Sequence, residues 1–544
     1  MTRFAPTDPR RTVVRGLAAA LAALQLAGCA GGPGGLSAAE TRAQSNPLDR
    51  AQVTQTNFTP ALRCMDELMF ELGTRDVTLM MEELRDATQR VPVSGRDMMT
   101  SALADMTRRS RAVQLSAFGA DQANLAQLLQ QAQKTQPFAV VPEFSVRGAI
   151  SQIDEDVRRQ SSSFGVLAAT FGLRLGNETR LSVLGFDAAM VRTDTFIVVP
   201  GVASKNTTVI TRQDNSAGDG QGRILNTGTV FAFSAGRTEG TAQAARNMVE
   251  LAAVELVGKL IRAPYWQCLG VADSQSGVQR ELEDWFLSMD EGERTIFIKE
   301  RLRARRWFDG PLDDSASPAY TQAVAAYRRA LGLPAAGDTD LDFFKRLITE
   351  RTAQGPLAAP ARRARARVAA TETSTEASTG ASTGATAPTV ASAAATSGAG
   401  AGTAPEPGAA AAPPPIARLQ LTRRAAGTGR EELQVQSDVD GYVYCYAQDP
   451  ATREVRRIFP NRFVRDPRIS AGRRLSVPGK GRFRLPAQQA LACLHAPTEV
   501  YGDLPAALRW GDFDTVRLNS FEQIQQAFAQ ASGQNVAIAL APGR

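Results

Sequence analysis

Cys493 and His495, near the C-terminus, are residue types that carry nucleophilic catalysis. Residues two apart on a β-strand share one face, so the thiol and the imidazole would lie side by side. Catalysis also needs a group that orients the imidazole, and no such group is evident near them in the sequence. His495 is the only histidine of the chain, which excludes most zinc sites and every Ser-His-Asp mechanism that does not use it. The sequence therefore predicts no enzyme activity, no metal and no cofactor.

The N-terminal residues indicate export and lipid attachment. A basic stretch at 10–15 precedes an apolar run at 17–26 that is too short to cross a bilayer as a helix, which is typical of a signal peptide. The run ends in Leu26-Ala27-Gly28-Cys29, which resembles the lipobox of bacterial lipoproteins and implies acyl chains on Cys29. Ala30 follows, where an aspartate accompanies inner-membrane retention, so the resemblance implies the outer membrane. The alternative is a plain secretory peptide that ends in cysteine.

Four further cysteines remain, and an even number in an exported protein favours disulfides. Cys64 and Cys268 bracket one candidate domain, while Cys445 and Cys493 lie inside another. We therefore expect one disulfide within each domain, with free buried thiols as the alternative for each pair.

The composition is that of a globular chain with several domains. The chain has 544 residues, 43% hydrophobic and 22% charged, which suggests about three or four domains. Lysines and arginines number 62 against 55 acidic residues, and this small excess gives little support to nucleic-acid binding. The predicted segments are a signal peptide at 1–28, a tether at 29–60, an α/β domain at 61–270, a helical domain at 281–351, a linker at 352–415 and a β-rich domain at 416–544.

Two regions of the α/β domain, 163–199 and 207–236, alternate apolar residues with small or polar ones, which predicts β-hairpins. The apolar residues that we expect in membrane-facing arms are Leu167, Phe171, Leu173, Phe231 and Phe233. Arms of about nine to eleven residues are what a tilted strand needs to cross a bilayer. Hairpins of an ordinary soluble sheet fit the same alternation.

Five short motifs follow one another along the α/β domain. They are Phe138-Ala139-Val140-Val141, Val146-Arg147-Gly148-Ala149-Ile150, Leu181-Ser182-Val183, Val202-Ala203-Ser204-Lys205 and Ala253-Val254-Glu255-Leu256-Val257. Their order, the lipobox and the two hairpin regions resemble the CsgG and HfaB group of outer-membrane lipoproteins. In that group a periplasmic α/β domain assembles into a ring, and each subunit gives two hairpins to one shared transmembrane β-barrel. The resemblance implies a homo-oligomer in contact with outer-membrane lipid, because lipid-facing backbone groups are all paired only in a closed barrel.

One segment departs from the curli-type secretion channels of that group. Those channels narrow their pore with a loop that carries Tyr, Asn and Phe, whereas the matching segment here, Arg85 to Arg96, has no aromatic residue. Arg90 and Arg96 are the candidates for a positive ring in a pore, and exposed loop arginines are the alternative. An anchoring ring is therefore as compatible with the sequence as a gated pore.

The helical and C-terminal segments resemble two further domain types. Phe308-Asp309-Gly310-Pro311-Leu312-Asp313 and Leu331-Gly332-Leu333-Pro334 flank a helical stretch that Ser317 caps, and they resemble the small three-helix peptidoglycan-binding domain. A copy that only packs against its neighbours is the alternative. In the last segment, a tyrosine-rich strand followed by Phe459-Pro460-Asn461 resembles a β-sandwich-like bacterial domain of unknown function. The linker before it has the composition of a flexible coil, so we expect the last domain to sample a wide volume.

These features together predict an α/β periplasmic domain with two hairpins for an oligomeric transmembrane β-barrel, a small helical domain and a C-terminal β-sandwich-like domain. The predicted function is an oligomeric outer-membrane lipoprotein that forms a secretion pore or an anchoring ring. Its expected partners are other copies of the chain, peptidoglycan, and a secreted or anchored protein. The main alternative is a periplasmic scaffold or binding lipoprotein that links the outer membrane to peptidoglycan without a pore. A cell-wall hydrolase is a weaker alternative, because no catalytic cluster is evident.

Overall fold

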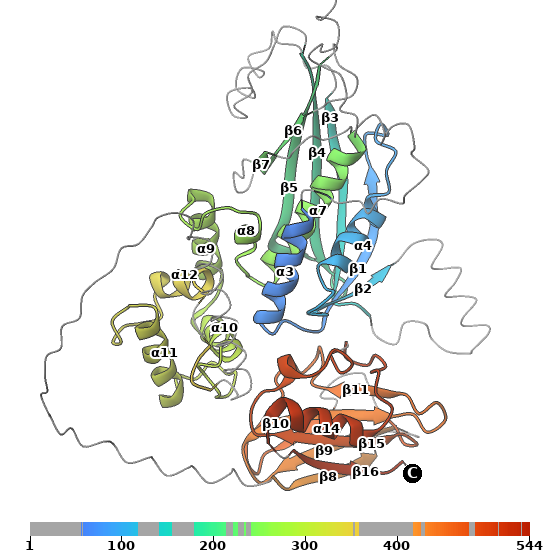
Figure 1. The fold of residues 1–544 in the computed structure, drawn as a ribbon, viewed down its shortest axis with the longest axis vertical. Coiled ribbons are helices and arrows are strands. Elements are labelled where there is room, and N and C mark those ends of the chain that lie inside the picture. Colours follow the sequence, from blue (N-terminus) through green and yellow to red (C-terminus); the bar gives the residue numbers. More distant parts are fainter. Residues whose placement is uncertain are drawn as a thin grey trace, which may run out of the picture.

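The computed structural model describes residues 56, 58–117, 141–154, 179–213, 221–226, 233–234, 241–351, 354–357, 417–425, 430–477, 485–509, 511–534 and 536–543. These residues form a mixed α/β molecule with a β-rich C-terminal domain (Figure 1). Cys29, Leu167, Phe171, Leu173 and Phe231 lie outside the described residues.

The first domain is a sheet with helices α3, α4 and α7 on one face (Figure 1). Its described strands have the order β2-β1-β3-β4-β5-β6-β7. Strands β2, β1 and β3 run parallel, and β3 to β7 form an antiparallel series. The bounds are α3 Thr59–Glu71, β1 Val77–Asp86, α4 Gly95–Asp105, β2 Val113–Ala117, β3 Phe144–Asp154, β4 Thr179–Arg192, β5 Val198–Gln213, β6 Gln221–Asn226, β7 Phe233–Ser234, α7 Thr241–Leu260 and α8 Tyr265–Cys268.

The apolar spacing of the sequence explains this packing. Val77, Leu79 and Met81 alternate along β1 and are buried in the core that α4 also enters. Helix α4 begins after Ser94, whose hydroxyl caps it by accepting a hydrogen bond from the amide of Asp97 (3.3 Å). Helix α7 packs against the sheet, α3 and α4.

The strands of the expected hairpin regions pair in a different combination. The first region, 163–199, contributes β4, but the antiparallel partners of β4 are β3, which precedes that region, and β5. Strand β5 then pairs with β6, as expected for the second region. Because β3 and β5 run in the same direction, the β3-to-β4 and β5-to-β6 connections leave the same end of the sheet (Figure 1).

The helical segment consists of short capped helices: α9 Ser276–Ser288, α10 Glu291–Ala304, α11 Pro318–Ala330 and α12 Leu341–Thr349. Asp290 and Glu293 form a capping box at the start of α10. Ser317 caps α11 ahead of Pro318, as the sequence predicts, by accepting a hydrogen bond from the amide of Tyr320 (3.3 Å). Phe344 of α12 contacts the rings of Phe286 and Phe297, which joins three of the helices.

The C-terminal domain contains two sheets among its described residues. In the five-stranded sheet β11-β10-β15-β16, strand β12 also pairs with β10; in the four-stranded sheet β13-β9-β14, strand β8 also pairs with β9. The bounds are β8 Leu419–Ala425, β9 Arg430–Ser437, β10 Gly441–Gln448, β11 Val455–Phe459, β12 Arg468–Ile469, β13 Arg474–Val477, β14 Leu485–Pro486, β15 Ala490–Ala496, η1 Tyr501–Asp503, α14 Phe521–Ser532 and β16 Ala537–Ala541.

Strand β10 lies at the centre of this domain and is buried along its whole length. Tyr442 and Tyr444 on one side of β10 belong to the core that includes Phe528 of α14, while Val443 and Cys445 on the other side pack against the second sheet. The tyrosine-rich strand that the sequence predicts is therefore β10, and it is fully buried. Helix α14 is an addition to the expected β-rich domain.

The C-terminal domain lies against one end of the first sheet (Figure 1). Its side chains contact Asp76, Gln114 and Glu143, which stand at or just before the amino ends of β1, β2 and β3. The β3-to-β4 and β5-to-β6 connections leave from the opposite end. Among the described helices, none is both long enough and apolar enough to cross a membrane.

Candidate functional site at the junction of three domains

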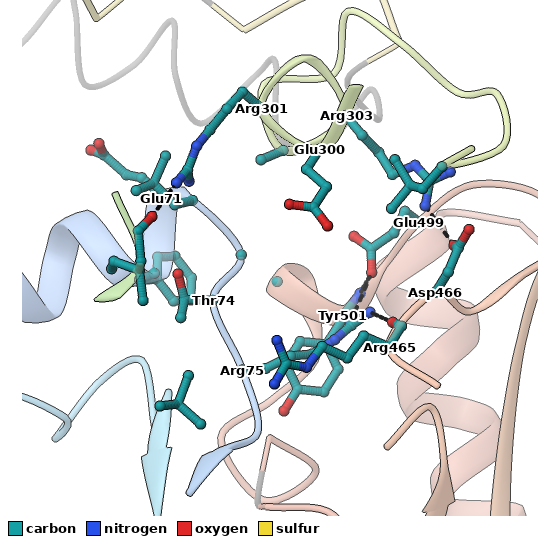
Figure 2. Close-up of a pocket in the computed structure, with 18 of the residues that line it drawn as sticks. Glu71, Thr74, Arg75, Glu300, Arg301, Arg303, Arg465, Asp466, Glu499 and Tyr501 are labelled. Atoms are coloured by element: carbon teal, nitrogen blue, oxygen red, sulfur yellow. Dashed lines mark hydrogen bonds and ion pairs between the residues drawn. The ribbon is translucent and has the colours of Figure 1, made fainter. Parts of the chain in front are cut away.

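A cavity of about 420 Å³ lies where the α/β domain, the helical segment and the C-terminal domain meet (Figure 2). Its walls include residues 70–75 and 260–262 of the α/β domain and residues 465–467 of the C-terminal domain. The helical segment adds Glu300, Arg301, Arg303, Ala304 and Arg306, and the C-terminal domain adds Glu499, Tyr501 and Gly502. Charged side chains from each domain are therefore brought to one place, although they are far apart in the sequence.

Three helices end at this cavity in the same backbone motif. After α3, α7 and α10, the amide two residues beyond the cap bonds back to a carbonyl of the last turn, from Thr74 to Met69, from Ala263 to Gly258 and from Trp307 to Leu302. This motif requires one residue in the left-handed conformation, which is Gly73 after α3 but Arg262 and Arg306 after α7 and α10. Arginine in that conformation costs roughly 1 kcal/mol more than glycine.

Glu499 is the centre of an ion-pair network in the cavity wall. It lies 3.0 Å from the Arg306 guanidinium and 3.6 Å from that of Arg75, and it accepts a hydrogen bond from the Tyr444 hydroxyl (2.7 Å). Burial alone would raise the pKa of Glu499, but the two arginines and the hydrogen bonds lower it to about 2. Glu499 is therefore a fixed negative charge that joins all three domains.

Two other charged side chains of the cavity make no such contact. Within the described residues, neither the Glu300 carboxylate nor the Arg262 guanidinium has a hydrogen bond or an ion pair. Glu300 is open to the cavity and points into it (Figure 2), and burial by the surrounding protein raises its pKa. The neighbouring Arg301 donates to the Ile261 carbonyl, and burial lowers its pKa to about 10.

A buried ion pair fixes the C-terminal domain to the first sheet. The Arg457 guanidinium contacts both carboxylate oxygens of Asp76, at 2.6 and 3.1 Å, and both side chains are fully buried. Asp76 also accepts a hydrogen bond from the amide of Asp512 (3.1 Å). Arg462 contacts Asp512 and Gln114 beside this pair. The expectation that the last domain samples a wide volume is therefore wrong, because its long linker joins two surfaces that bind each other.

The four remaining cysteines form the two disulfides that the sequence favours. Cys64 of α3 is bonded to Cys268 of α8, and Cys445 of β10 is bonded to Cys493 of β15. Cys493 therefore offers no thiol to His495, whose imidazole is buried and has a lowered pKa because of that burial. Within the described residues, no group of three or more His, Cys, Asp or Glu side chains is placed to hold a metal ion.

The arginines proposed for a pore loop take two different positions. The loop is shorter than expected, because Arg85 and Asp86 belong to β1, and Gly95 and Arg96 belong to α4. Arg90 is exposed in this loop, at the end of the sheet from which the two hairpin connections leave. Arg96 lies in the first turn of α4 and has ion pairs with Glu83 (3.8 Å) and Asp97 (3.6 Å), so its charge is already compensated.

Of the expected membrane-facing residues, only Phe233 is within the described part of the chain, in β7, where it pairs with Ile224 of β6. Sequence reasoning missed Asp76, Arg262, Glu300 and Arg457. Arg457 carried a signal, because it occupies an inward position between Val455 and Phe459 of β11 and therefore needs a buried partner.

Comparison with known proteins gives little information on function. Residues 431–492 match the model of a domain of unknown function, DUF4384, and this match falls inside the C-terminal domain. A crystal structure described as a neuraminyllactose-binding hemagglutinin homolog from Helicobacter pylori is similar over 39% of this chain and 89% of that chain, at 11% identity and a TM-score of 0.17. That score is too low to support an argument. No curated protein matches the chain significantly.

Proposed function

We propose that this chain is an oligomeric outer-membrane lipoprotein that forms a secretion pore or an anchoring ring. The observation that supports it best is the placement of two strand connections, β3 to β4 and β5 to β6, at the end of the sheet opposite the C-terminal domain. Two hairpins that leave one end together can enter a membrane side by side, while the other domains stay in the periplasm. The lipobox at Cys29 supports the same membrane, with the acyl chains as its anchor.

Strand length supports the proposal as well. Strands β4 and β5 have 14 and 16 residues, which correspond to roughly 45 and 50 Å of extended chain. Helix α4 has 11 residues, or roughly 16 Å. The strands are therefore much longer than the helix beside them, and hairpins that continue from their ends are the parts that we assign to a shared transmembrane β-barrel. Such a barrel leaves no unpaired edge in lipid only when several copies contribute.

The helical segment supports contact with the cell wall in this proposal. It has short helices, and Ser317 caps α11 as the sequence predicts. Its position beside the C-terminal domain keeps it at the end of the molecule away from the proposed membrane. The partner in secretion or anchoring is a protein, which this assembly would export or hold.

Removal of the lipid anchor tests the proposal. The Cys29→Ser variant is expected to remain oligomeric and to require detergent, because the hairpins themselves contact lipid. Size-exclusion chromatography with light scattering, with and without detergent, measures both properties. A variant that is monomeric and stable in buffer without detergent would contradict the barrel and favour the alternative, a scaffold lipoprotein that links the outer membrane to peptidoglycan.

The membrane-facing arms give a second test. The Phe171→Asp and Phe231→Asp variants are each expected to make membrane insertion less favourable by about 1–2 kcal/mol per subunit, because the carboxylate would contact lipid. The yield of detergent-purified oligomer measures this loss. The matched controls are Thr170→Asp and Ala232→Asp, which change the neighbouring residue on the opposite face of each arm. Equal yields from all four variants would contradict the assignment of the faces.

A further inference from the structure

The cavity at the junction of the three domains contains two charges of opposite sign that make no hydrogen bond or ion pair within the described residues. Glu300 is one residue before Arg301 on α10, and Arg262 follows α7. In the same cavity wall, Arg75, Arg303 and Arg306 all have acidic partners. Glu300 and Arg262 interact with opposite charges of the cavity, including each other, only at longer range and without a direct contact.

The left-handed backbone conformation of Arg262 supports a functional role for its side chain. Residue 262 has a φ of 49°, in the left-handed conformation that glycine adopts most easily, and the equivalent position after α3 is a glycine. An arginine at this position strains the backbone more than a glycine would. Within the described residues, its guanidinium neither forms an ion pair with an acid nor caps a helix. A guanidinium in this state is suited to a carboxylate, which it binds with two parallel hydrogen bonds.

The Glu300 carboxylate has no hydrogen bond or ion pair within the described residues and is free to contact a ligand cation, although the charges of Arg301, Arg303 and Arg465 also act on it. The carboxyl ends of α3, α7 and α10, which carry partial negative charge, surround the same cavity. A ligand ammonium at Glu300 would therefore be attracted both by the carboxylate and by the helix ends. An anion alone would be attracted by Arg262 but repelled by Glu300, and a cation alone would meet the opposite conflict.

We propose that this cavity binds a small zwitterion, an amino acid or a short peptide with both ends free, through its carboxylate at Arg262 and its ammonium at Glu300. A volume of about 420 Å³ is at the lower end of the range of small-molecule sites, which suits a ligand of a few residues. Because the walls come from three domains, the ligand contacts all of them and favours their docked arrangement. This inference does not depend on the proposed pore or ring.

The test uses the full chain in detergent and three peptides that differ only in their ends. They are trialanine, N-acetyl-trialanine, which lacks the ammonium, and trialanine amide, which lacks the carboxylate. We expect calorimetry to show binding of trialanine and at least about tenfold weaker binding of either blocked peptide. No binding of trialanine, or equal affinity for the three peptides, would overturn the proposal.

Two variants assign the ends of the ligand. Arg262→Gly removes the guanidinium and relieves the left-handed backbone, so the protein stays folded, and this variant should bind trialanine no better than trialanine amide. Glu300→Gln should bind trialanine no better than the acetylated peptide. The control is Arg329→Gln, an exposed change on α11, which should leave the affinity for trialanine unchanged. A loss in Arg329→Gln as large as that in Arg262→Gly would also overturn the assignment.

Discussion

The Arg457→Ala variant is expected to lose about 3–5 kcal/mol of stability at the boundary between the C-terminal domain and the first sheet. The reason is that Asp76, the partner of Arg457, would remain buried. Asp76 is 1% exposed, and without Arg457 its carboxylate would be a buried charge with no cation to compensate it. Arg75 contributes to lowering the pKa of Asp76, but Arg457 has the larger effect among the charges that oppose desolvation.

Hydrogen exchange is the measurement that suits this prediction, because a chain with several domains does not unfold in one step. We expect faster exchange in β1 and β11 of Arg457→Ala, together with a larger hydrodynamic radius as the C-terminal domain separates. The matched control is Arg456→Ala, one residue earlier, whose side chain is exposed and pairs only with Glu454. That change should cost less than about 1 kcal/mol.

A double-mutant cycle separates the ion pair from other contacts of the same residues. The Asp76→Ala variant should show a loss similar to that of Arg457→Ala, and the double variant should lose little more than either single variant. Additive losses would mean that the two residues act independently, and equal exchange in Arg457→Ala and Arg456→Ala would mean that the buried pair does not hold the domain.

Local patterns predicted much of the fold. The spacing of Met99 and Leu103 predicted α4, and Ser94 and Ser317 were identified as caps because their hydroxyls precede helical stretches. The continuous run of apolar and tyrosine residues from Gly441 to Tyr446 indicates a buried strand. These features depend on residues within about ten positions of one another, and such short-range preferences are readable from a single sequence.

The arrangement of the domains was not predictable in the same way. Asp76 and Arg457 are 381 positions apart, and neither segment alone shows which residue its charge will meet. The linker composition predicts a flexible coil, but the composition of a linker does not decide whether the surfaces it joins bind each other. For the same reason, the cavity with Arg262 and Glu300 could not be found before the three domains were placed together.

The second large effect is expected from Glu255, a fully buried residue of α7. It accepts hydrogen bonds from the Ser204 hydroxyl (2.5 Å) and the Asn206 amide (3.3 Å), both on β5. Burial raises its pKa to about 7, although Lys259 and these hydrogen bonds favour the charged form. The folded protein therefore carries a carboxyl group that ionises less readily than it does in the unfolded chain.

The sign of the pH dependence follows from this shift. Below the ordinary pKa of about 4.5 the group is protonated in both states and costs nothing, whereas above pH 7 it is charged in both states and the folded state carries the full penalty of about 3 kcal/mol. Glu255→Gln keeps an acceptor for Ser204 but cannot ionise, so we expect it to stabilise the protein by about 3 kcal/mol at pH 8 and by less than about 1 kcal/mol at pH 5. Hydrogen exchange of the α7 amides at the two pH values, corrected for the intrinsic exchange rates, measures this difference, with the exposed Glu283→Gln as control. A Glu255→Gln variant that is less stable than the parent protein at pH 8 would mean that the charged carboxylate, with its bonds to β5, is the form that the fold requires.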